Sequence, residues 1–381
     1  MIEYESKLPP TGTSIFAIMS NLAREHSAIN LGQGFPDYPI SNKLKSYVAH
    51  YLNDGKNQYA PMPGLLSLRE RISQKYHSAY HRQISADKEV TIHAGATQAI
   101  FMTIAAFVKK DDEVIIIEPA YDCYLPTISM MGAKPFAVTV REPSYKVDWN
   151  ELADCMTEKT RMIIVNNPHN PIGTTFDKSD MLSLQDIVKD KNIIVLSDEV
   201  YEHLVYDGVM HQSVLAYPQL AEQSVAIYSF GKTFHATGWK MGYSIASAHL
   251  MNEIRNVHQW NVFSVNSFIQ YALTDFLEDP EEYNKLSSFF QYKRDLLQDA
   301  LSDTSLMPLA CTGTYFQLYD YSSISDLSDI EFAHWLVREY GVATIPISPF
   351  YKDKEADKVV RFCFAKEDAT LLRAAEKLRK L

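Results

Sequence analysis

The chain has 381 residues, of which 46% are hydrophobic and 22% are charged, and its formal net charge is −11. This length exceeds what one ordinary hydrophobic core organises, so we expect two domains, or one large domain with a smaller appendage. The acidic balance, with no basic cluster to offset it, argues against nucleic acid as a partner, because nucleic-acid binding needs a basic face.

The sequence carries no signal for a membrane, for export or for a metal. No apolar run approaches the ~20 residues that span a bilayer. The acidic residues 1–5 lack the basic and apolar regions of a signal peptide. The four cysteines are far apart without a CxxC spacing, and the histidines form no HExxH pattern. We therefore predict a cytoplasmic protein with no disulfide framework, no membrane association and no metal site.

In the first half of the chain, the pattern predicts an N-terminal helix and then an α/β sheet. Residues 14–26 read as an amphipathic helix with Thr13 or Ser14 as N-cap. From about residue 65, helical stretches alternate with short, nearly continuous apolar runs. Such runs are typical of strands buried on both faces of a parallel sheet, and the intervening lengths suit helical crossovers. The five runs cover residues 90–92, 114–117, 162–165, 193–196 and 225–228.

The pattern changes after about residue 275, where helices accompany only a few strands. We predict a large α/β domain over residues 45–275. A smaller α+β domain is expected from residues 1–44 and 276–381, because the N-terminal helix precedes the large block. Predicted helices there cover residues 286–301, 331–340 and 369–381, and predicted strands cover 313–318 and 359–364.

Polar and aromatic residues follow each of the five apolar runs, where ligands of open α/β sheets bind. Lys232 follows the fifth run, in the turn Ser229-Phe230-Gly231-Lys232. A lysine presented by such a turn is suited to form an imine with a carbonyl. Ser229 and Lys240 could hold a phosphate nearby. The alternative reading of Lys232 is a solvated surface charge.

The first run is followed by residues 95–98, which open a predicted helix over 99–108. The free N–H groups and the positive dipole end of a helix N-terminus suit a phosphate. The alternative is that Thr97 caps the helix and no ligand binds. The segment is not GxGxxG, so a dinucleotide site is not indicated.

Asp198 ends the fourth apolar run, and a buried carboxylate needs a partner. A protonated pyridine nitrogen is one such partner, and Tyr201 would then bond a phenolic oxygen on the same ring. The alternative is that Asp198 is a helix N-cap.

Three further residues have both a functional and a structural interpretation. Asn170 lies in a rigid turn between prolines, where it either donates to a ring oxygen or supplies turn hydrogen bonds. Tyr121 either stacks on an aromatic ring or belongs to the core. Arg361, inside an apolar strand, either receives a carboxylate ligand or forms an internal salt bridge.

The order and spacing of these segments resemble the class I aminotransferases of the fold-type I pyridoxal-phosphate enzymes. The chain is most similar to the branch containing bacterial methionine aminotransferases and kynurenine aminotransferases. The shared segments run from residues 31–36 to 361–366 and cover nearly the whole chain. The resemblance implies a mostly parallel seven-stranded sheet sandwiched by helices in the large domain. It also implies pyridoxal 5′-phosphate as cofactor and a homodimer that shares its active sites.

The same resemblance assigns roles to individual positions. Lys232 would be the Schiff-base lysine and general base, and Asp198 would pair with the pyridine nitrogen. The position of Lys240 is often arginine in the wider class, and lysine keeps the charge but loses the bidentate fork. The remaining implied roles are ring-oxygen contacts by Tyr201 and Asn170, stacking by Tyr121, phosphate binding by Ala96, Thr97, Ser229, Lys240 and the neighbouring subunit's Tyr59, and substrate-carboxylate binding by Arg361 and the Gly34 backbone.

The reaction implied by the resemblance is a ping-pong transamination from an apolar, thioether or aromatic L-amino acid to a 2-oxo acid. Methionine is favoured, because no second arginine stands out for a distal carboxylate. One alternative is a cysteine-S-conjugate or cystathionine β-lyase, which would release pyruvate and ammonia without an acceptor. A second is a non-catalytic pyridoxal-phosphate sensor. The residues that the resemblance places around the substrate side chain are Phe16, Tyr38, Tyr59, Tyr121, Phe263 and Phe350, and Asn170 is also expected to contact the substrate.

Overall fold

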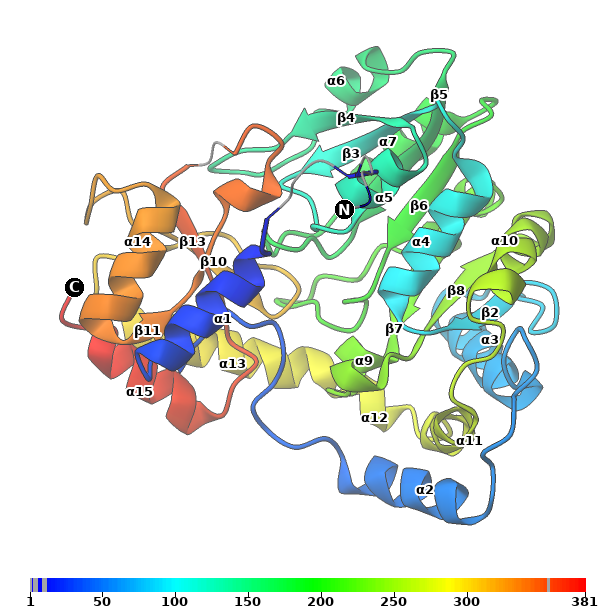
Figure 1. The fold of residues 1–381 in the computed structure, drawn as a ribbon, viewed down its shortest axis with the longest axis horizontal. Helices are drawn as coiled ribbons and strands as arrows, with labels where there is room; N and C mark the ends of the chain where they lie inside the picture. Colours follow the sequence, from blue (N-terminus) through cyan, green and yellow to red (C-terminus); the bar gives the residue numbers. More distant parts are fainter. Residues whose placement is uncertain (1, 3–5, 9–11, 355–356) are drawn as a thin grey trace.

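A seven-stranded sheet with helices on both faces forms the larger part of the molecule (Figure 1). The computed structural model describes residues 2, 6–8, 12–354 and 357–381. The strand order is β2-β8-β7-β6-β5-β3-β4, and only β8 runs antiparallel to its neighbours. The mostly parallel seven-stranded sheet is thus confirmed. The strands are β2 (Val90–His93), β3 (Glu113–Glu118), β4 (Lys134–Thr139), β5 (Thr160–Asn166), β6 (Ile194–Asp198), β7 (Ser224–Ser229) and β8 (Gly242–Ala246).

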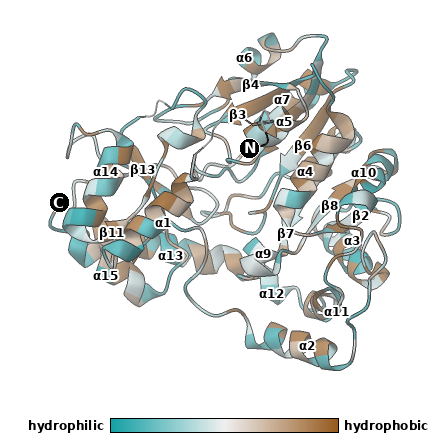
Figure 2. Cartoon of the chain, viewed as in Figure 1, coloured by the Kyte–Doolittle hydropathy of each residue, from teal (hydrophilic) through white to brown (hydrophobic). Residues whose placement is uncertain are grey.

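The central strands are buried on both faces because their side chains alternate between two hydrophobic cores. In β3, Ile115 and Ile117 belong to one core, whereas Val114 and Ile116 belong to the other. Figure 2 shows the resulting hydrophobic colouring of the central strands. This double burial explains why the five predicted runs, which became β2, β3, β5, β6 and β7, are nearly continuous in apolar character.

Two strands of the sheet lacked that pattern in the sequence. β4 lies at the sheet edge, and most of its residues are partly or fully exposed. β8 is buried, but its sequence, Gly242-Tyr243-Ser244-Ile245-Ala246, mixes a glycine and a serine with apolar residues. Neither strand produces the short continuous apolar run that marked the other five.

Each face of this sheet has its own set of helices. The core that contains Val114 and Ile116 also contains the apolar residues of α4 (Ala96–Phe107), α5 (Tyr124–Met130) and α10 (Ala248–Asn261). The other core includes residues of α3 (Leu66–Tyr80), α6 (Trp149–Asp154), α7 (Lys178–Val188), α8 (Pro218–Ala221) and α11 (Ser267–Phe276), while α2 (Asn42–Asn53) packs on α11.

No helix in the described ranges combines the length and the apolar character needed to cross a bilayer.

The N-terminal and C-terminal parts of the chain meet beside this sheet (Figure 1). β1 (Ile29–Asn30) pairs in parallel with β11 (Val342–Ala343), and α1 (Ile15–Glu25) packs on β11. Ser14 caps α1, as predicted, by accepting from the Ala17 N–H. A four-stranded sheet in the order β12-β13-β10-β9 lies in the same region. Its strands are β9 (Met307–Pro308), β10 (Phe316–Asp320), β12 (Ile345–Pro346) and β13 (Val359–Cys363).

The association of α1 with the C-terminal strands agrees with the expected smaller domain, although the division at residues 45 and 275 stays a prediction. The helix predicted over 331–340 is an α-helix followed by a π-helical turn, which Gly341 ends in the left-handed conformation. The helices after residue 280 are α12 (Glu281–Asn284), α13 (Leu286–Leu301), α14 (Asp329–Trp335), the π-helix η3 (Leu336–Tyr340) and α15 (Asp368–Leu378).

A buried ion pair joins α3 to the segment after β6. Lys75 Nζ lies 2.6 Å from Glu202 Oε1, and both side chains are almost completely buried. Glu202 also accepts from the hydroxyls of Tyr76 and Tyr243. Burial alone would raise the pKa of Glu202, but the nearby Lys75 ammonium lowers it to about 2. The carboxylate therefore stays charged in the core because its donors stay in place.

We predict that Lys75→Met destabilises the fold by about 3–5 kcal/mol, because it leaves the Glu202 carboxylate buried without its cation. Adding Glu202→Gln to that variant should recover much of the loss. Urea unfolding of the two variants measures both effects. Lys358→Met removes an exposed ion pair with Asp326 and serves as control, since it should leave the unfolding free energy nearly unchanged. Equal losses for Lys75→Met and Lys358→Met would contradict the prediction.

Candidate active site

The carboxyl ends of β5, β6 and β7 and the N-terminus of α4 surround one cavity. Parallel strands bring residues from distant parts of the sequence to this edge of the sheet. Nine of the predicted site residues line the cavity together. These nine are Ala96, Thr97, Tyr121, Asn170, Asp198, Tyr201, Ser229, Lys232 and Lys240; the other lining residues are Gly95, Ile100, Asn166, Val200, Gly231, Thr237 and Met241.

Lys232 lies in the short helix α9 (Phe230–Thr233), which begins directly after β7. The Ser229 hydroxyl caps this helix by accepting from the Lys232 N–H at 3.3 Å. The Lys232 Nζ donates to the Tyr315 hydroxyl at 3.0 Å and to the Gly34 carbonyl at 3.3 Å. Burial lowers the pKa of the Lys232 amine to about 8. The alternative of a solvated surface lysine is therefore wrong, and the amine is poised between its neutral and charged forms near neutral pH.

Asp198 is the last residue of β6, and its carboxylate is buried at the cavity. It accepts from the Tyr124 hydroxyl at 2.6 Å and from the Val200 N–H at 3.3 Å. Burial raises the pKa of Asp198 to about 6, against the opposing effect of the Tyr124 hydrogen bond. A turn rather than a helix follows Asp198, so the alternative of a helix N-cap is wrong. A cation placed in the cavity would lower this pKa and keep Asp198 ionised.

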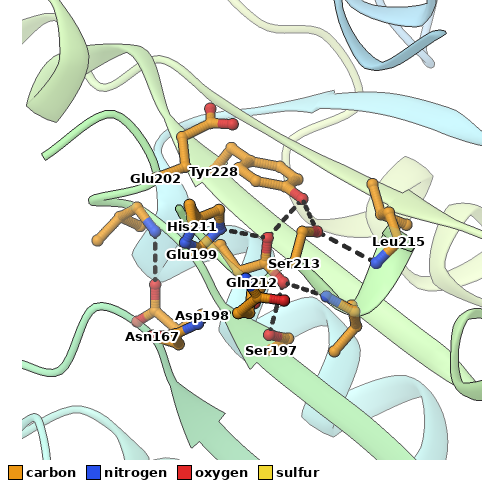
Figure 3. A network of polar contacts seen from close by, with 12 residues as sticks. Asn167, Ser197, Asp198, Glu199, Glu202, His211, Gln212, Ser213, Leu215 and Tyr228 are labelled. Atoms are coloured by element: carbon orange, nitrogen blue, oxygen red, sulfur yellow. Dashed lines mark hydrogen bonds and ion pairs between the residues drawn. The ribbon is translucent and has the colours of Figure 1, made fainter. Parts of the chain in front are cut away.

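The residue after Asp198 belongs to a network of polar contacts at the end of β6 (Figure 3). Glu199 is fully buried and accepts from the Tyr228 hydroxyl, the Val214 N–H and the Ser197 hydroxyl at 2.8–3.0 Å. The His211 Nε2 lies 3.1 Å from the same carboxylate. With every carboxylate oxygen engaged, Glu199 cannot rotate freely, and this fixes the direction in which Asp198 projects.

The N-terminus of α4 forms a positively polarised end of the cavity. Gly95 is the N-cap, and no side chain in the described ranges caps the helix, so the alternative in which Thr97 caps it is wrong. Gly95 has a φ of +86°, and a Cβ there would lie 3.2 Å from the Lys240 Cε. The Lys240 side chain therefore lies beside Gly95, at the N-terminus of α4. Helix dipole, free N–H groups and ammonium together suit a phosphate.

Arg361 adjoins the cavity through Asn170. The guanidinium is 1% exposed, donates to the Asn170 Oδ1 at 2.7 Å and to the Gly32 carbonyl at 3.3 Å, and lies 3.7 Å over the Phe316 ring. Among the residues that the structure describes, it forms no ion pair, and its Nε has no hydrogen-bond partner. The alternative of an internal salt bridge is therefore not found. An anionic ligand would satisfy this buried cation.

The bond from Arg361 also orients Asn170. The Asn170 Oδ1 accepts from the guanidinium, and its amide Nδ2 donates to no residue that the structure describes, so this donor is available at the cavity. The backbone of Asn170 is held by the Asn166 side chain at 2.7 Å. Among the described residues, the Asn170 side chain bonds Arg361 rather than the backbone of its turn, so the alternative of turn hydrogen bonds is not found, and the contact with a ring oxygen stays a prediction.

Two aromatic residues from the predicted set surround Arg361 rather than the cavity. Phe16 and Phe350 pack edge-to-face with ring centroids 5.7 Å apart, and both rings lie within 6 Å of the guanidinium carbon. Gly34 is placed against Lys232 by its carbonyl, and a Cβ there would lie 2.7 Å from Phe316. Only glycine fits that close approach without displacing the ring.

Three further predicted residues, which do not contact Arg361, also lie outside the cavity. Tyr59 is 82% exposed and packs edge-to-face on Phe263, which is 49% exposed. Tyr38 lines a second hollow, behind α9, together with His235 and Phe289. Tyr38 is directed there because its ring packs edge-to-face on His235 and Phe289. The prediction that Tyr38 lines the substrate pocket is therefore not supported by its position.

The comparisons with known proteins agree with this geometry. The family model described as "Aminotransferase class I and II" matches residues 26–378. The chain belongs to this family. The aminotransferase is 48% identical to the methionine aminotransferase of Escherichia coli over 99% of this chain and 98% of the relative. It is 36% identical to a kynurenine–oxoglutarate transaminase of Dictyostelium discoideum, over 97% and 94% of the two chains.

Solved structures give the same assignment. A crystal structure of an Escherichia coli protein with a methionine aminotransferase function superposes with a TM-score of 0.97, at 47% identity and over the whole of both chains. The N-succinyldiaminopimelate aminotransferase of Mycobacterium tuberculosis superposes with a TM-score of 0.94, at 33% identity, over 99% of this chain and 100% of that chain. The predicted fold class and the enzyme class are thus confirmed.

Sequence reasoning missed the residues that hydrogen-bond Lys232, Asp198 and Asn170 and so support the aminotransferase site. Tyr315 contacts Lys232, and Tyr124 contacts Asp198. Asn166 bonds the Asp198 carbonyl and the Asn170 N–H. Asn166 ends β5, so its position beyond an apolar run was an available signal. Tyr315 and Tyr124 gave none, because each is one tyrosine among 23 and reaches its partner across the fold.

We predict that, in protein without cofactor, the acylation rate of Lys232 rises with pH and levels off just above a pKa of about 8. Burial makes the neutral amine available well below the ~10.4 of an ordinary lysine. Mass spectrometry of the peptide that contains Lys232, after timed acylation between pH 6 and 11, measures this rate. A rate that keeps rising to pH 10 and beyond, as for free lysine, would show that the amine is solvated.

Proposed function

We propose that this aminotransferase binds pyridoxal 5′-phosphate in the cavity and transfers the amino group of methionine, or of a similar apolar or aromatic L-amino acid, to a 2-oxo acid. The observation that carries the proposal is the convergence on one cavity of a lysine amine, a buried carboxylate and an open helix N-terminus. Each of these suits a different part of the cofactor, namely the carbonyl, the ring nitrogen and the phosphate.

The residues that line the cavity match the chemical groups of that cofactor. Ala96, Thr97, Ser229 and Lys240 would hold the phosphate, and Asp198 would face the ring nitrogen. The Asn170 amide and the Tyr201 hydroxyl would bond the ring oxygen, and Tyr121 would cover the ring. When bound, pyridoxal phosphate supplies a carbonyl that condenses with amines and a ring that withdraws electrons from the substrate Cα.

The protein's own contribution is to hold and move protons. Lys232 would attach the cofactor and, once released by the incoming amino acid, would take the proton from the substrate Cα. Its lowered pKa, about 8, keeps a useful fraction of the amine neutral. Asp198, held by Tyr124 and by the backbone of Val200, would keep the ring nitrogen protonated.

Substrate selection would rest on Arg361 and on the apolar residues around it. The guanidinium has donors to spare for an α-carboxylate, and the Gly34 backbone lies on the same side as Lys232. Phe16 and Phe350 give the surroundings of Arg361 an apolar character. No arginine is among the described residues that line the cavity, and Arg361 adjoins it through Asn170. These features favour methionine over aspartate, as do the names of the relatives.

A second copy of the chain would complete the site. Tyr59 and Phe263 are exposed and lie outside the cavity in one copy, so they fit residues that a homodimer brings to the neighbouring site. In this proposal, Tyr59 reaches the phosphate of the partner and Phe263 adjoins the substrate there. The cytoplasmic location stays a prediction.

The direct test is a single turnover. Enzyme loaded with pyridoxal phosphate and given L-methionine without a 2-oxo acid should release about one equivalent of the 2-oxo acid of methionine per chain, as measured by mass spectrometry. Lys232→Ala should bind the cofactor yet release essentially none, because the base is missing. Continuous release of ammonia without an acceptor would instead indicate a lyase, and equal rates on aspartate and methionine would overturn the substrate preference.

We predict that Arg361→Lys raises KM for methionine by about 10-fold or more while kcat changes less, because lysine lacks the bidentate fork. Steady-state kinetics with a saturating 2-oxo acid measures both constants. Arg69→Lys is the matched control, since Arg69 is also buried but donates to backbone carbonyls away from the cavity. A KM change of the same size in both variants would mean that Arg361 acts only on stability.

A further inference from the structure

Lys232 belongs to a closed hydrogen-bonded cluster that extends beyond the residues assigned so far. The Tyr315 hydroxyl lies 3.0 Å from the Lys232 Nζ and 2.6 Å from the Gly34 carbonyl oxygen. The Lys232 Nζ lies 3.3 Å from that same carbonyl. The three groups come from α9, from the segment before β10 and from the N-terminal loop.

The number of protons in the cluster determines the direction of each bond. Tyr315 has a single O–H, and it donates that proton to the Gly34 carbonyl. Toward Lys232, the phenol oxygen is therefore an acceptor. A neutral primary amine has two N–H groups and one lone pair. Tyr315 and Gly34 accept the two N–H groups, so the lone pair points away from both.

We propose that Tyr315 is a positioning residue of transamination, whose phenol oxygen holds one N–H of Lys232 so that the amine lone pair faces the substrate Cα. This inference rests on the proposed function, in which Lys232 takes the Cα proton. In that step the Cα–H bond breaks, its electron pair stays with the cofactor-bound substrate, and the proton becomes the third N–H of Lys232. The charged amine would then give this proton to the C4′ carbon of the cofactor, because a neutral phenol and a peptide carbonyl are too weakly basic to keep it.

Other groups around Lys232 act on its charge rather than on its direction. Burial lowers the pKa of Lys232 most, Cys363 and Asp198 raise it, and the cations of Arg361 and Lys240 lower it. None of them donates to or accepts from the Lys232 Nζ in the described part of the chain. Orientation of the amine therefore falls to Tyr315 and Gly34.

The test variant is Tyr315→Phe, which removes one oxygen and keeps the ring. The ring should keep its place, because it packs against Tyr201, Phe290 and Phe316 at centroid distances of 4.8–5.8 Å. The matched control is Tyr319→Phe. Tyr319 lies four residues along, is fully buried, and its hydroxyl has no hydrogen-bond partner among the described residues. Melting temperatures of both variants check that they fold.

In the single-turnover reaction with methionine, Tyr315→Phe should lower the rate by about tenfold or more, since a positioned base contributes about 10²–10⁴-fold. KM should stay close to the wild-type value. The rate difference between ordinary and Cα-deuterated methionine should grow, because proton removal becomes slower than the other steps. Tyr319→Phe should match the wild type in all three respects.

A second readout needs no cofactor. In the cofactor-free protein, Tyr315→Phe should lower the pKa of Lys232, measured by acylation, below its wild-type value, because a buried ammonium loses an acceptor. Tyr319→Phe should leave that pKa unchanged. Site-specific 3-fluorotyrosine at position 315 weakens the acceptor without removing it and should act in the same direction, which keeps the test available if Tyr315→Phe does not fold.

A Tyr315→Phe enzyme with the wild-type rate, isotope effect and Lys232 pKa would overturn the inference. A lower rate with an unchanged isotope effect and pKa would also overturn it, because that pattern indicates a purely structural role. Failure of the proposed function is distinguishable from both. In that case the wild type would release no 2-oxo acid, while acylation of the cofactor-free protein would still report whether Tyr315 contacts Lys232.

Discussion

The site depends on one constraint, which is that ionised groups removed from water need partners. In the core behind the cavity, the constraint is met within the chain. Glu202 has Lys75, and Glu199 has four donors. At the cavity, the buried ionised groups have only some of the partners they need. Among the residues that the structure describes, Asp198 has two donors but no cation bonded to it, and Arg361 has no carboxylate bonded to it. This contrast between satisfied and unsatisfied charge separates the supporting residues from those that meet a ligand.

The geometry of the sheet places these unsatisfied groups together. Parallel strands end at the same edge, so Asn166, Asp198 and Ser229 project toward one space although they lie more than 30 residues apart in sequence order. The antiparallel β8 fits this arrangement as well. It begins at Gly242, beside the end of β7 and the start of α4, where a Cβ would lie 2.8 Å from the Ala96 nitrogen. The sheet thus brings Lys240, just before β8, to the phosphate end of the cavity.

Much of this arrangement was accessible from the sequence, because burial leaves a readable pattern. The five doubly buried strands appear as apolar runs, and the residues after them line the cavity. The pattern failed where burial is one-sided or mixed, as in β4 and β8. It failed again for Tyr315 and Tyr124, whose roles depend on which side chain they meet across the fold. The packing of the Tyr38 ring on His235 and Phe289 behind α9 was likewise not visible in the sequence.

The pairing of β1 with β11 has a consequence for how the protein is made. Ile29 pairs with Val342, and the Gly32 carbonyl receives its bond from Arg361, so partners of the N-terminal segment lie more than 300 residues downstream. During synthesis, α1 leaves the ribosome long before those strands exist. Its apolar face, including Met19 and Ala23, therefore has no C-terminal strands to pack against while the seven-stranded sheet is synthesised. Completion of the site is therefore one of the last events in the folding of the nascent chain.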